Sequence, residues 1–489
     1  MKTITRFFLI ILSVLAYNAS NATQLQAYFS YNRMYAPGQG TYIETNLQVL
    51  CKTVVLKLNA AGKLQGEVEA TFIFHQGDKI ATFRKITVLS PELDDTAANN
   101  ITFLDQQRIP IEPGDYEFEI IIADKNSENK SFSTTEKLTI PDYGASGVTI
   151  SDIQIIDSWK KAETETALTR NGLDIIPYLS DFMPENMDNL RFYCEVYNSD
   201  KIPDADGFAL RYFLQVSETG KPLNTYIRIK RQKTGPVNVV LAELPINELP
   251  SGNYFLIVEV RDKNNTLITS NSIFFQRSNP SFQIKLEDLT AISIASTFVE
   301  KITDQDTLLD YIHSCWPIAT SLERRFMDNQ LKMADMDLMR KFMLRFWEAR
   351  SEDPEATWKQ YHTEVCKVQK EFGTRIKRGY ETDRGRVYLQ YGPPNSIAKE
   401  NIDPNAYPYE IWHYYSLQNQ RNKKFVFYNP DEVTNDYALL HSDAIGEIND
   451  NNWEYKLHSR NNPWGGVDQN GINQSNFGSN SSKQFKNPY

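Results

Sequence analysis

The sequence has few of the residues that metal proteins and many enzymes use. Its 489 residues include only 4 cysteines and 6 histidines. The cysteines form no CxxC pair and the histidines form no HExxH motif, which argues against the usual zinc sites. There is also no Walker A loop, no dinucleotide-binding fingerprint and no GxSxG nucleophile elbow. The sequence therefore predicts no cofactor, no metal and no catalytic residue, and it leaves an enzymatic function open but unsupported.

The cysteines leave two alternatives open for their redox state. Cys315 and Cys366 both fall in a region with helical periodicity and could form a disulfide in an oxidising compartment. The alternative is that they are free thiols packed in the protein. Cys194 lies on an alternating strand pattern, so we expect it to face a core.

The chain also lacks an excess of basic residues and a second long apolar run. Lysine and arginine number 52 against 62 aspartate and glutamate, which gives a formal charge of −10. Nucleic-acid-binding proteins normally carry a basic face, so no nucleic-acid partner is expected. Apart from the N-terminus, no run is long enough to span a bilayer, so the mature chain has no predicted transmembrane segment. Peripheral membrane association remains compatible with this composition.

The N-terminus has the pattern of a secretory signal peptide at residues 1–22. Lys2 and Arg6 precede an apolar run at 7–16, and Ser20-Asn21-Ala22 fits a cleavage site. No cysteine lies near that site, so we expect no lipid anchor there. The pattern predicts an exported protein that is periplasmic or associated with the outer membrane, with an extracellular location as the alternative.

Two β-rich segments follow, at residues 23–142 and 146–278. Each has short alternating runs separated by turn residues, which favours a β-sandwich. The motif PGDY at 113–116, with DKN downstream at 124–126, recurs as PSGNY at 250–254 with DKN at 262–264. A tyrosine after such a turn is typical of the tyrosine corner of immunoglobulin-like domains. We infer two tandem all-β immunoglobulin-like sandwiches derived from one duplicated unit.

The third segment is predicted to be an α+β domain, a helical hairpin on a small antiparallel sheet. Residues 285–375 show apolar stripes at helical spacing, with a capping box at 320–323. Residues 376–456 are expected to form one unit with these helices. Its strands are predicted at 386–391, 409–415 and 424–428, and the tail at 457–489 is predicted to be disordered. Carboxylates on the helices, such as Glu323, are interpreted as solvated.

One stretch of this domain resembles a known family. The run GYETDRGR at 379–386, followed by YGPP at 391–394 and EIW at 410–412, resembles the GWxTD domain family. The tryptophan of the family motif is Tyr380 here, so an aromatic side chain is kept but an indole N–H is not. The resemblance implies a secreted or envelope protein of bacteria such as the Bacteroidota, and it implies no established reaction.

The motif supplies the candidate contact residues. An arginine near Asp383 could bind a carboxylate or phosphate through its forked guanidinium, and the alternative is a turn held by internal bonds. The candidate residues for ligand or partner contact are Tyr380, Asp383, Arg384, Arg386, Tyr391 and Trp412.

These observations favour a non-catalytic exported cell-envelope protein that acts as a structural or protein-interaction module, with an envelope or outer-membrane protein as its partner. The alternative is a carbohydrate- or peptidoglycan-binding or processing protein, with Tyr407, Tyr409 and Trp412 stacking on sugar rings and Asp383 as an acid or base. Thr96 and Thr307 lie in D-T-aliphatic sequences that resemble a signal for O-glycosylation.

Overall fold

The computed structural model describes most of the chain in two units, which divide after Asp142. The predicted signal peptide at 1–22 lies outside the described residues, as does most of the predicted tail. The described residues are 25–128, 131–144, 147–203, 206–282, 289, 292–401, 403, 406–417, 420–450, 452–461, 481 and 485.

The first unit is a β-sandwich with one hydrophobic core. Alternating side chains such as Phe72, Phe118 and Leu47 point inward from its two sheets, because successive strand residues face opposite sides. All pairings within these sheets are antiparallel. The sheets have the orders β1(Ala27–Ala36)-β2(Gly40–Leu50)-β7(Thr102–Pro110) and β6(Lys79–Leu89)-β5(Glu67–Gln76)-β8(Gly114–Asp124)-β9(Phe132–Ile140), with a short pair β3(Lys57–Leu58) and β4(Leu64–Gln65).

The second unit begins with another sandwich, which we call sandwich 2 (residues 147–282). Its core again lies between two sheets, with Phe192 and Tyr212 in edge-to-face contact. One sheet contains β10(Thr149–Ile150), β15(Asn189–Tyr197), β11(Gln154–Lys161), β13(Leu173–Pro177), β12(Thr169–Arg170) and β18(Val237–Pro245), which pairs with β15. The other has the order β14(Phe182–Met183)-β20(Leu267–Arg277)-β19(Gly252–Arg261)-β16(Gly207–Val216)-β17(Arg228–Lys233).

The repeated motif forms the same structure in both sandwiches. The hydroxyl of Tyr116 donates to the backbone oxygen of Glu112 at 2.9 Å, and Tyr254 donates to that of Pro250 at 3.0 Å. Each tyrosine lies near the start of a strand with a neighbour on both sides, β8 in the first unit and β19 in sandwich 2. These bonds are tyrosine corners, so the prediction of two immunoglobulin-like sandwiches is confirmed.

After sandwich 2 the second unit continues as an α+β domain, which we call the head (residues 292–461). Its helices pack through large aromatic side chains, and the ring centroids of Trp347 in α4(Met336–Glu348) and Trp358 in α5(Pro354–Phe372) are 5.6 Å apart. The predicted capping box of Thr320 and Glu323 is present at the start of α3(Ser321–Asn329). The helices are α2(Gln305–Ser314), α3(Ser321–Asn329), α4(Met336–Glu348), α5(Pro354–Phe372), α6(Asp383–Tyr391) and α7(Trp453–Leu457).

Short 3-10 turns connect these helices. They are η5(Phe298–Lys301), η6(Trp316–Ile318), η7(Leu331–Met333), η8(Gly379–Glu381) and η9(His458–Asn461).

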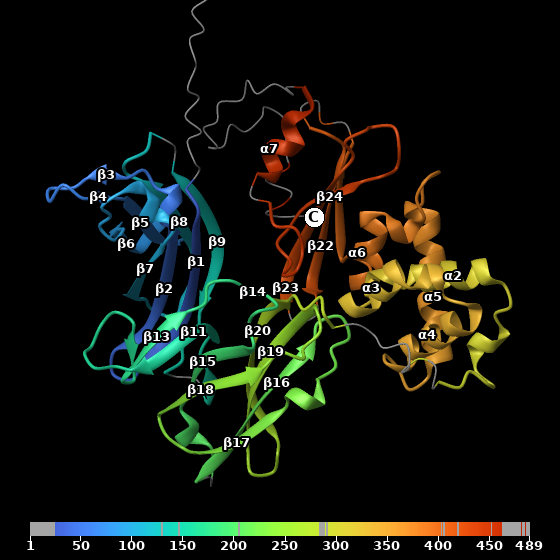
Figure 1. Ribbon diagram of the computed structural model, residues 1–489, viewed down its shortest axis with the longest axis horizontal. Helices are drawn as coiled ribbons and strands as arrows, with labels where there is room; N and C mark the ends of the chain where they lie inside the picture. Colours follow the sequence, from blue (N-terminus) through green and yellow to red (C-terminus); the bar gives the residue numbers. More distant parts are fainter. Residues whose placement is uncertain are drawn as a thin grey trace, which may run out of the picture. The chain divides into compact units, whose positions relative to one another are not determined.

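A four-stranded antiparallel sheet forms the middle layer of the head. Trp412 and Phe427 point to one face, where they pack against α5 and α6, and Ile411 and Val426 point to the other face, toward α7. Helix α6 therefore lies between the sheet and the other helices (Figure 1). The order is β21(Ser396–Glu400)-β22(Tyr409–Leu417)-β23(Gln420–Tyr428)-β24(Ala438–Ser442).

Residues 386–391 were predicted as a strand, and this prediction is wrong because they belong to α6. Alternation suggested a strand, but Val387, Tyr388 and Leu389 are all buried in succession, since α6 is covered on several sides. Thr382 caps the helix by accepting the Gly385 N–H at 3.1 Å. The place of the predicted strand is taken by β21 and β24.

Of the two alternatives for Cys315 and Cys366, the structure has the free thiols. Cys315 is buried and its Sγ donates to the Tyr311 oxygen, whereas Cys366 is exposed on α5. Within the tail predicted to be disordered, Phe485 packs against Trp453 at 5.2 Å between ring centroids. No helix of the described residues is long and apolar enough to cross a membrane.

Candidate functional site

The two motif glycines allow α6 to approach α5 closely. A Cβ on Gly385 would lie 1.9 Å from the backbone oxygen of Gly379, and one on Gly379 would lie 2.5 Å from that of Val368. Either contact is too short for a real Cβ atom. The Gln369 side chain also accepts the Gly379 N–H at 2.7 Å. Glycine at these two positions is therefore required by backbone packing.

The Thr-Asp pair of the motif fixes the start of α6. Besides capping the helix, the Thr382 hydroxyl donates to the Gly379 oxygen at 2.8 Å. Asp383 lies in the first helical turn, where a carboxylate is favoured by the helix dipole. Its Oδ2 accepts the N–H of Leu439 on β24 at 2.7 Å. The pair thus ties α6 to the edge of the sheet.

Arg384 forms a buried ion pair with Glu410 of β22. Its Nη1 donates to Glu410 Oε1 at 2.9 Å, and the two side chains are 3% and 4% exposed. Nη2 donates to the backbone and side-chain oxygens of Asn435 at 2.6 and 2.7 Å. The guanidinium also lies over the rings of Phe372 and Tyr437. Strand alternation places Glu410 beside Trp412, whose indole N–H donates to it at 2.9 Å.

Arg386 forms a second internal pair, with Glu447 beyond β24. Two parallel bonds of 2.8 Å join its Nη1 and Nη2 to the two carboxylate oxygens, the bidentate geometry of strong arginine–carboxylate pairs. The Tyr391 hydroxyl donates to Glu447 Oε1 at 2.8 Å. Burial, and then the charge of Glu447, raise the pKa of Tyr391 well above its usual range.

Tyr380 connects the motif to the helices. Its hydroxyl donates to Asp310 Oδ1 on α2 at 2.9 Å, and its ring is largely buried. Burial is the main cause, and the bond to Asp310 the second, of a pKa well above the usual range for tyrosine. A hydroxyl therefore serves at the position where the family motif has an indole N–H.

The structure separates the six predicted contact residues into three that line a pocket and three that are bonded inside the head. Tyr380, Asp383 and Arg386 are brought together around one pocket. Arg384 and Trp412 are buried with internal partners, so neither is available as a contact surface. Tyr391 donates its hydroxyl internally to Glu447.

In the alternative hypothesis of a sugar-binding protein, two of the three stacking residues are not accessible, because Tyr409 and Trp412 are both 0% exposed. Tyr407 packs in an edge-to-face contact with Tyr428.

The pocket has a volume of about 450 Å³ and lies where α2, η6, η8 and α6 meet. The three motif side chains form part of its wall. The other lining residues were not predicted, since nothing in their local sequence distinguishes them from ordinary helix ends. They are His313, Trp316 and Glu381.

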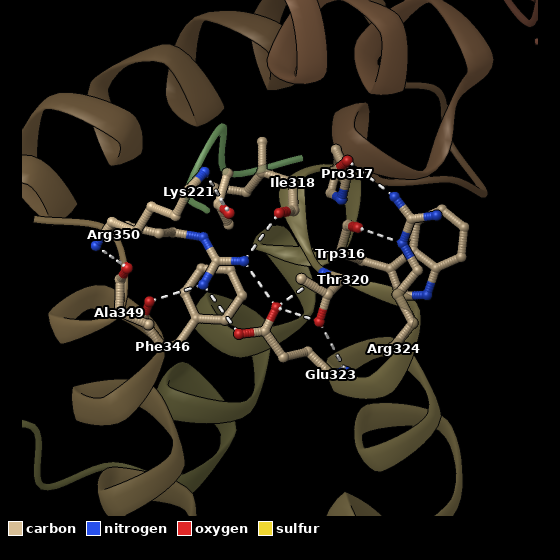
Figure 2. Close-up of polar contacts among 11 residues, drawn as sticks. Lys221, Trp316, Pro317, Ile318, Thr320, Glu323, Arg324, Phe346, Ala349 and Arg350 are labelled. Carbon is tan, nitrogen blue, oxygen red and sulfur yellow. Dashed lines mark hydrogen bonds and ion pairs between the residues drawn. The ribbon is translucent and has the colours of Figure 1, made fainter. Parts of the chain in front are cut away.

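A network of charged side chains holds α3, α4 and η6 together and includes Trp316, one of the residues that line this pocket (Figure 2). Arg350 donates to both oxygens of Glu323, at 2.9 and 2.7 Å, so Glu323 is not solvated as predicted but 15% exposed. Arg324 donates to the Trp316 oxygen at 3.1 Å and lies 4.3 Å from the centre of the Trp316 ring. The network therefore fixes the indole that lines the pocket.

The same region joins the head to sandwich 2. The Lys221 ammonium donates to the backbone oxygen of Ala349, as Figure 2 shows. Arg325 of α3 donates to the Pro280 oxygen at 2.9 Å and to the Ser251 hydroxyl at 3.0 Å. These polar bonds anchor the head to loops of sandwich 2.

Glu218 of sandwich 2 has one buried oxygen without a hydrogen-bond partner, and burial raises the pKa of its carboxyl.

The predicted modification residues are both exposed. Thr96 lies in the 3-10 turn η2(Thr96–Asn99) of the first unit. Thr307 lies in the first turn of α2, and its hydroxyl donates to Asp304 at 2.5 Å. Within the described ranges, no group of three or more His, Cys, Asp or Glu is placed to hold a metal ion.

The fold defines a class of protein in which an α+β head follows two β-sandwiches. Residues 296–454 match the family model of the GWxTD domain. The chain therefore contains a GWxTD domain, and the resemblance predicted from the motif is confirmed. No curated protein matches the chain.

Two solved structures show weak similarity. One is titled as fibronectin(III)-like modules of CbhA from Clostridium thermocellum, with 11% identity, 50% of this chain and 89% of that chain covered, and a TM-score of 0.15. The other is a DUF3823 family protein from Bacteroides ovatus, with 11% identity and a TM-score of 0.16. The match covers 46% of this chain and 96% of that protein.

Proposed function

We propose that this chain is an exported cell-envelope protein whose GWxTD head binds another protein and catalyses no reaction. The observation that carries the proposal is that both arginines of the motif are paired with carboxylates inside the head. Arg384 and Arg386, the side chains best suited to bind a substrate anion, are held by Glu410 and Glu447 inside the head. A site that acts on a small molecule would need such groups free to reach it. The motif instead builds a rigid wall, and the pocket beside it is the contact surface.

The sandwiches support the proposal as docking arms. Strand β6 ends its sheet and exposes Ile80, Phe83 and Leu89, each more than half exposed. An edge strand with exposed apolar side chains can receive an added strand from a partner. Strand β17, at the end of the other sandwich's sheet, carries arginine and lysine at four of its six positions, a pattern that prevents edge-to-edge association. The first sandwich is therefore the better candidate for strand addition.

Affinity capture from crosslinked envelopes tests the proposal. The mature chain with a tag is compared with Glu381→Arg, which reverses a charge at the exposed edge of the pocket, and with Glu352→Arg as the matched control. Glu352 is an exposed carboxylate in the turn between α4 and α5. We expect one reproducible partner protein with the wild type and with Glu352→Arg, and its loss with Glu381→Arg.

Two results would count against the proposal. Recovery of no reproducible protein would remove the evidence for a partner, and equal recovery by all three forms would place the contact elsewhere. Thermal unfolding of each variant checks that the head remains folded.

Export is tested separately by sequencing the N-terminus of the native protein. Cleavage after Ala22 is expected from the small residues at 20 and 22. An intact N-terminus in a cytosolic fraction would contradict export.

A further inference from the structure

The pocket of the head has two carboxylates that no basic side chain pairs with in the described residues. Glu381 accepts the Arg378 N–H at 2.7 Å, and Asp383 accepts the Leu439 N–H at 2.7 Å. Each of these bonds goes to a backbone amide and uses one oxygen. Both residues line the pocket. Their negative charges are therefore available to a ligand.

Three of the cations around the pocket have carboxylate partners of their own, whereas Arg324, which lies over the Trp316 ring, donates to the backbone oxygens of Trp316 and Pro317. Arg386 is neutralised by the bidentate pair with Glu447, Lys377 pairs with Asp436 at 2.7 Å, and Arg378 lies 3.5 Å from Asp310. With these three pairs counted as neutral, the two carboxylates Glu381 and Asp383 still exceed the one remaining positive charge, that of Arg324, by one. The electrostatic balance thus favours a cation over an anion.

The aromatic walls point to the same kind of ligand. Trp316 lines the pocket and has the Arg324 guanidinium 4.3 Å from its ring centre, so a ligand would have to use the part of the indole that Arg324 leaves uncovered. Tyr380 supplies a second ring, held by Asp310. Aromatic rings next to carboxylates are well suited to bind an ammonium or guanidinium group, which gains from both the ring faces and the negative charge.

We infer that this pocket binds a cationic side chain, the ammonium of lysine or the guanidinium of arginine, presented by the partner protein. This inference rests on the proposed function that the head binds a protein. The cation lies between Trp316 and Tyr380 with Glu381 and Asp383 as its counter-ions. Selectivity then comes from the charge, and affinity from the surface around the pocket.

A fluorine NMR titration tests the inference. The mature chain is labelled with 5-fluorotryptophan, and the Trp316 signal is assigned with Trp316→Phe. The probe is the peptide acetyl-Gly-Lys-Gly-amide, and the controls are the same peptide with acetylated lysine and one with glutamate in place of lysine. We expect only the lysine peptide to shift the Trp316 signal saturably. Glu381→Gln should weaken binding on the order of fivefold, as for a partly exposed ion pair, and Glu352→Gln should leave it unchanged.

The outcomes separate this inference from the proposed function. No shift with the lysine peptide, or an equal shift with the acetylated or glutamate peptide, would overturn the inference. If the envelope partner is still lost with Glu381→Arg, the proposed function survives that result. A saturable lysine-specific shift without any recovered partner would support the cation pocket and contradict the proposed function.

Discussion

Replacing Glu410 with glutamine tests whether the buried ion pair supports the fold of the head. The Arg384 Nη1 and Glu410 Oε1 atoms are 2.9 Å apart, and both side chains are almost fully buried. Glutamine keeps the shape but leaves the guanidinium buried without its counter-ion, and removal of one partner of a buried pair costs about 3–5 kcal/mol. We expect the free energy of unfolding of the head to fall by about this amount. Tryptophan fluorescence in guanidinium chloride measures it, because Trp316, Trp347, Trp358, Trp412 and Trp453 all lie in the head.

The control is Glu355→Gln, which removes an exposed pair with Lys359 on α5. It should lower the free energy of unfolding by less than about 1 kcal/mol, because both the exposed pair and the favourable position of Glu355 in the first turn of α5 are screened by solvent. Arg384→Met combined with Glu410→Gln should lose less than the sum of the single changes, by about 1–3 kcal/mol, as expected for groups in contact. A loss below about 1 kcal/mol for Glu410→Gln, or strict additivity of the two changes, would refute a supporting role for this pair.

Three further predictions concern single positions. Gly385→Ala should destabilise the head by about 3 kcal/mol or more in the same denaturation assay, because its Cβ would meet the Gly379 oxygen; a change below about 1 kcal/mol would contradict the close approach. Glu218→Gln should raise the melting temperature at pH 7. The pKa of Glu218 is raised in the folded state, so the wild type loses stability as pH rises through that pKa. The difference in melting temperature between the variant and the wild type should therefore vanish in acid, and a difference independent of pH would contradict this. Tyr380→Phe should cost about 1 kcal/mol through the lost bond to Asp310, and equal stability would show that the bond contributes nothing.

The sequence predicts the sandwiches well because their signals are local. The turn before Tyr116 and Tyr254 and the alternation of the following strands are both set by neighbouring residues. The helices α4 and α5 are predicted for the same reason, since their apolar stripes and caps lie within each helix.

The fold of the motif is harder to predict, because it depends on distant contacts. The alternation of apolar and polar residues at 386–391 predicts a strand. In the structure these residues form a helix that is covered by both α5 and the sheet, so apolar residues occur on several of its sides. The partners of Arg384 and Arg386 lie 26 and 61 residues away, so no local pattern shows that these charges are internal. Glu323 was misjudged in the same way, since its partner Arg350 lies on another helix. The pocket joins residues of α2, η6 and α6, and its location therefore required the structure.

The affinity of the purified chain for the partner recovered from envelopes tests the central claim most directly. A binding isotherm compares the wild type, Glu381→Arg and Glu352→Arg. We predict that Glu381→Arg binds about tenfold more weakly or worse, which corresponds to a loss of about 1.4 kcal/mol, while Glu352→Arg binds like the wild type. Equal affinity of all three forms would contradict recognition through the pocket of the GWxTD head.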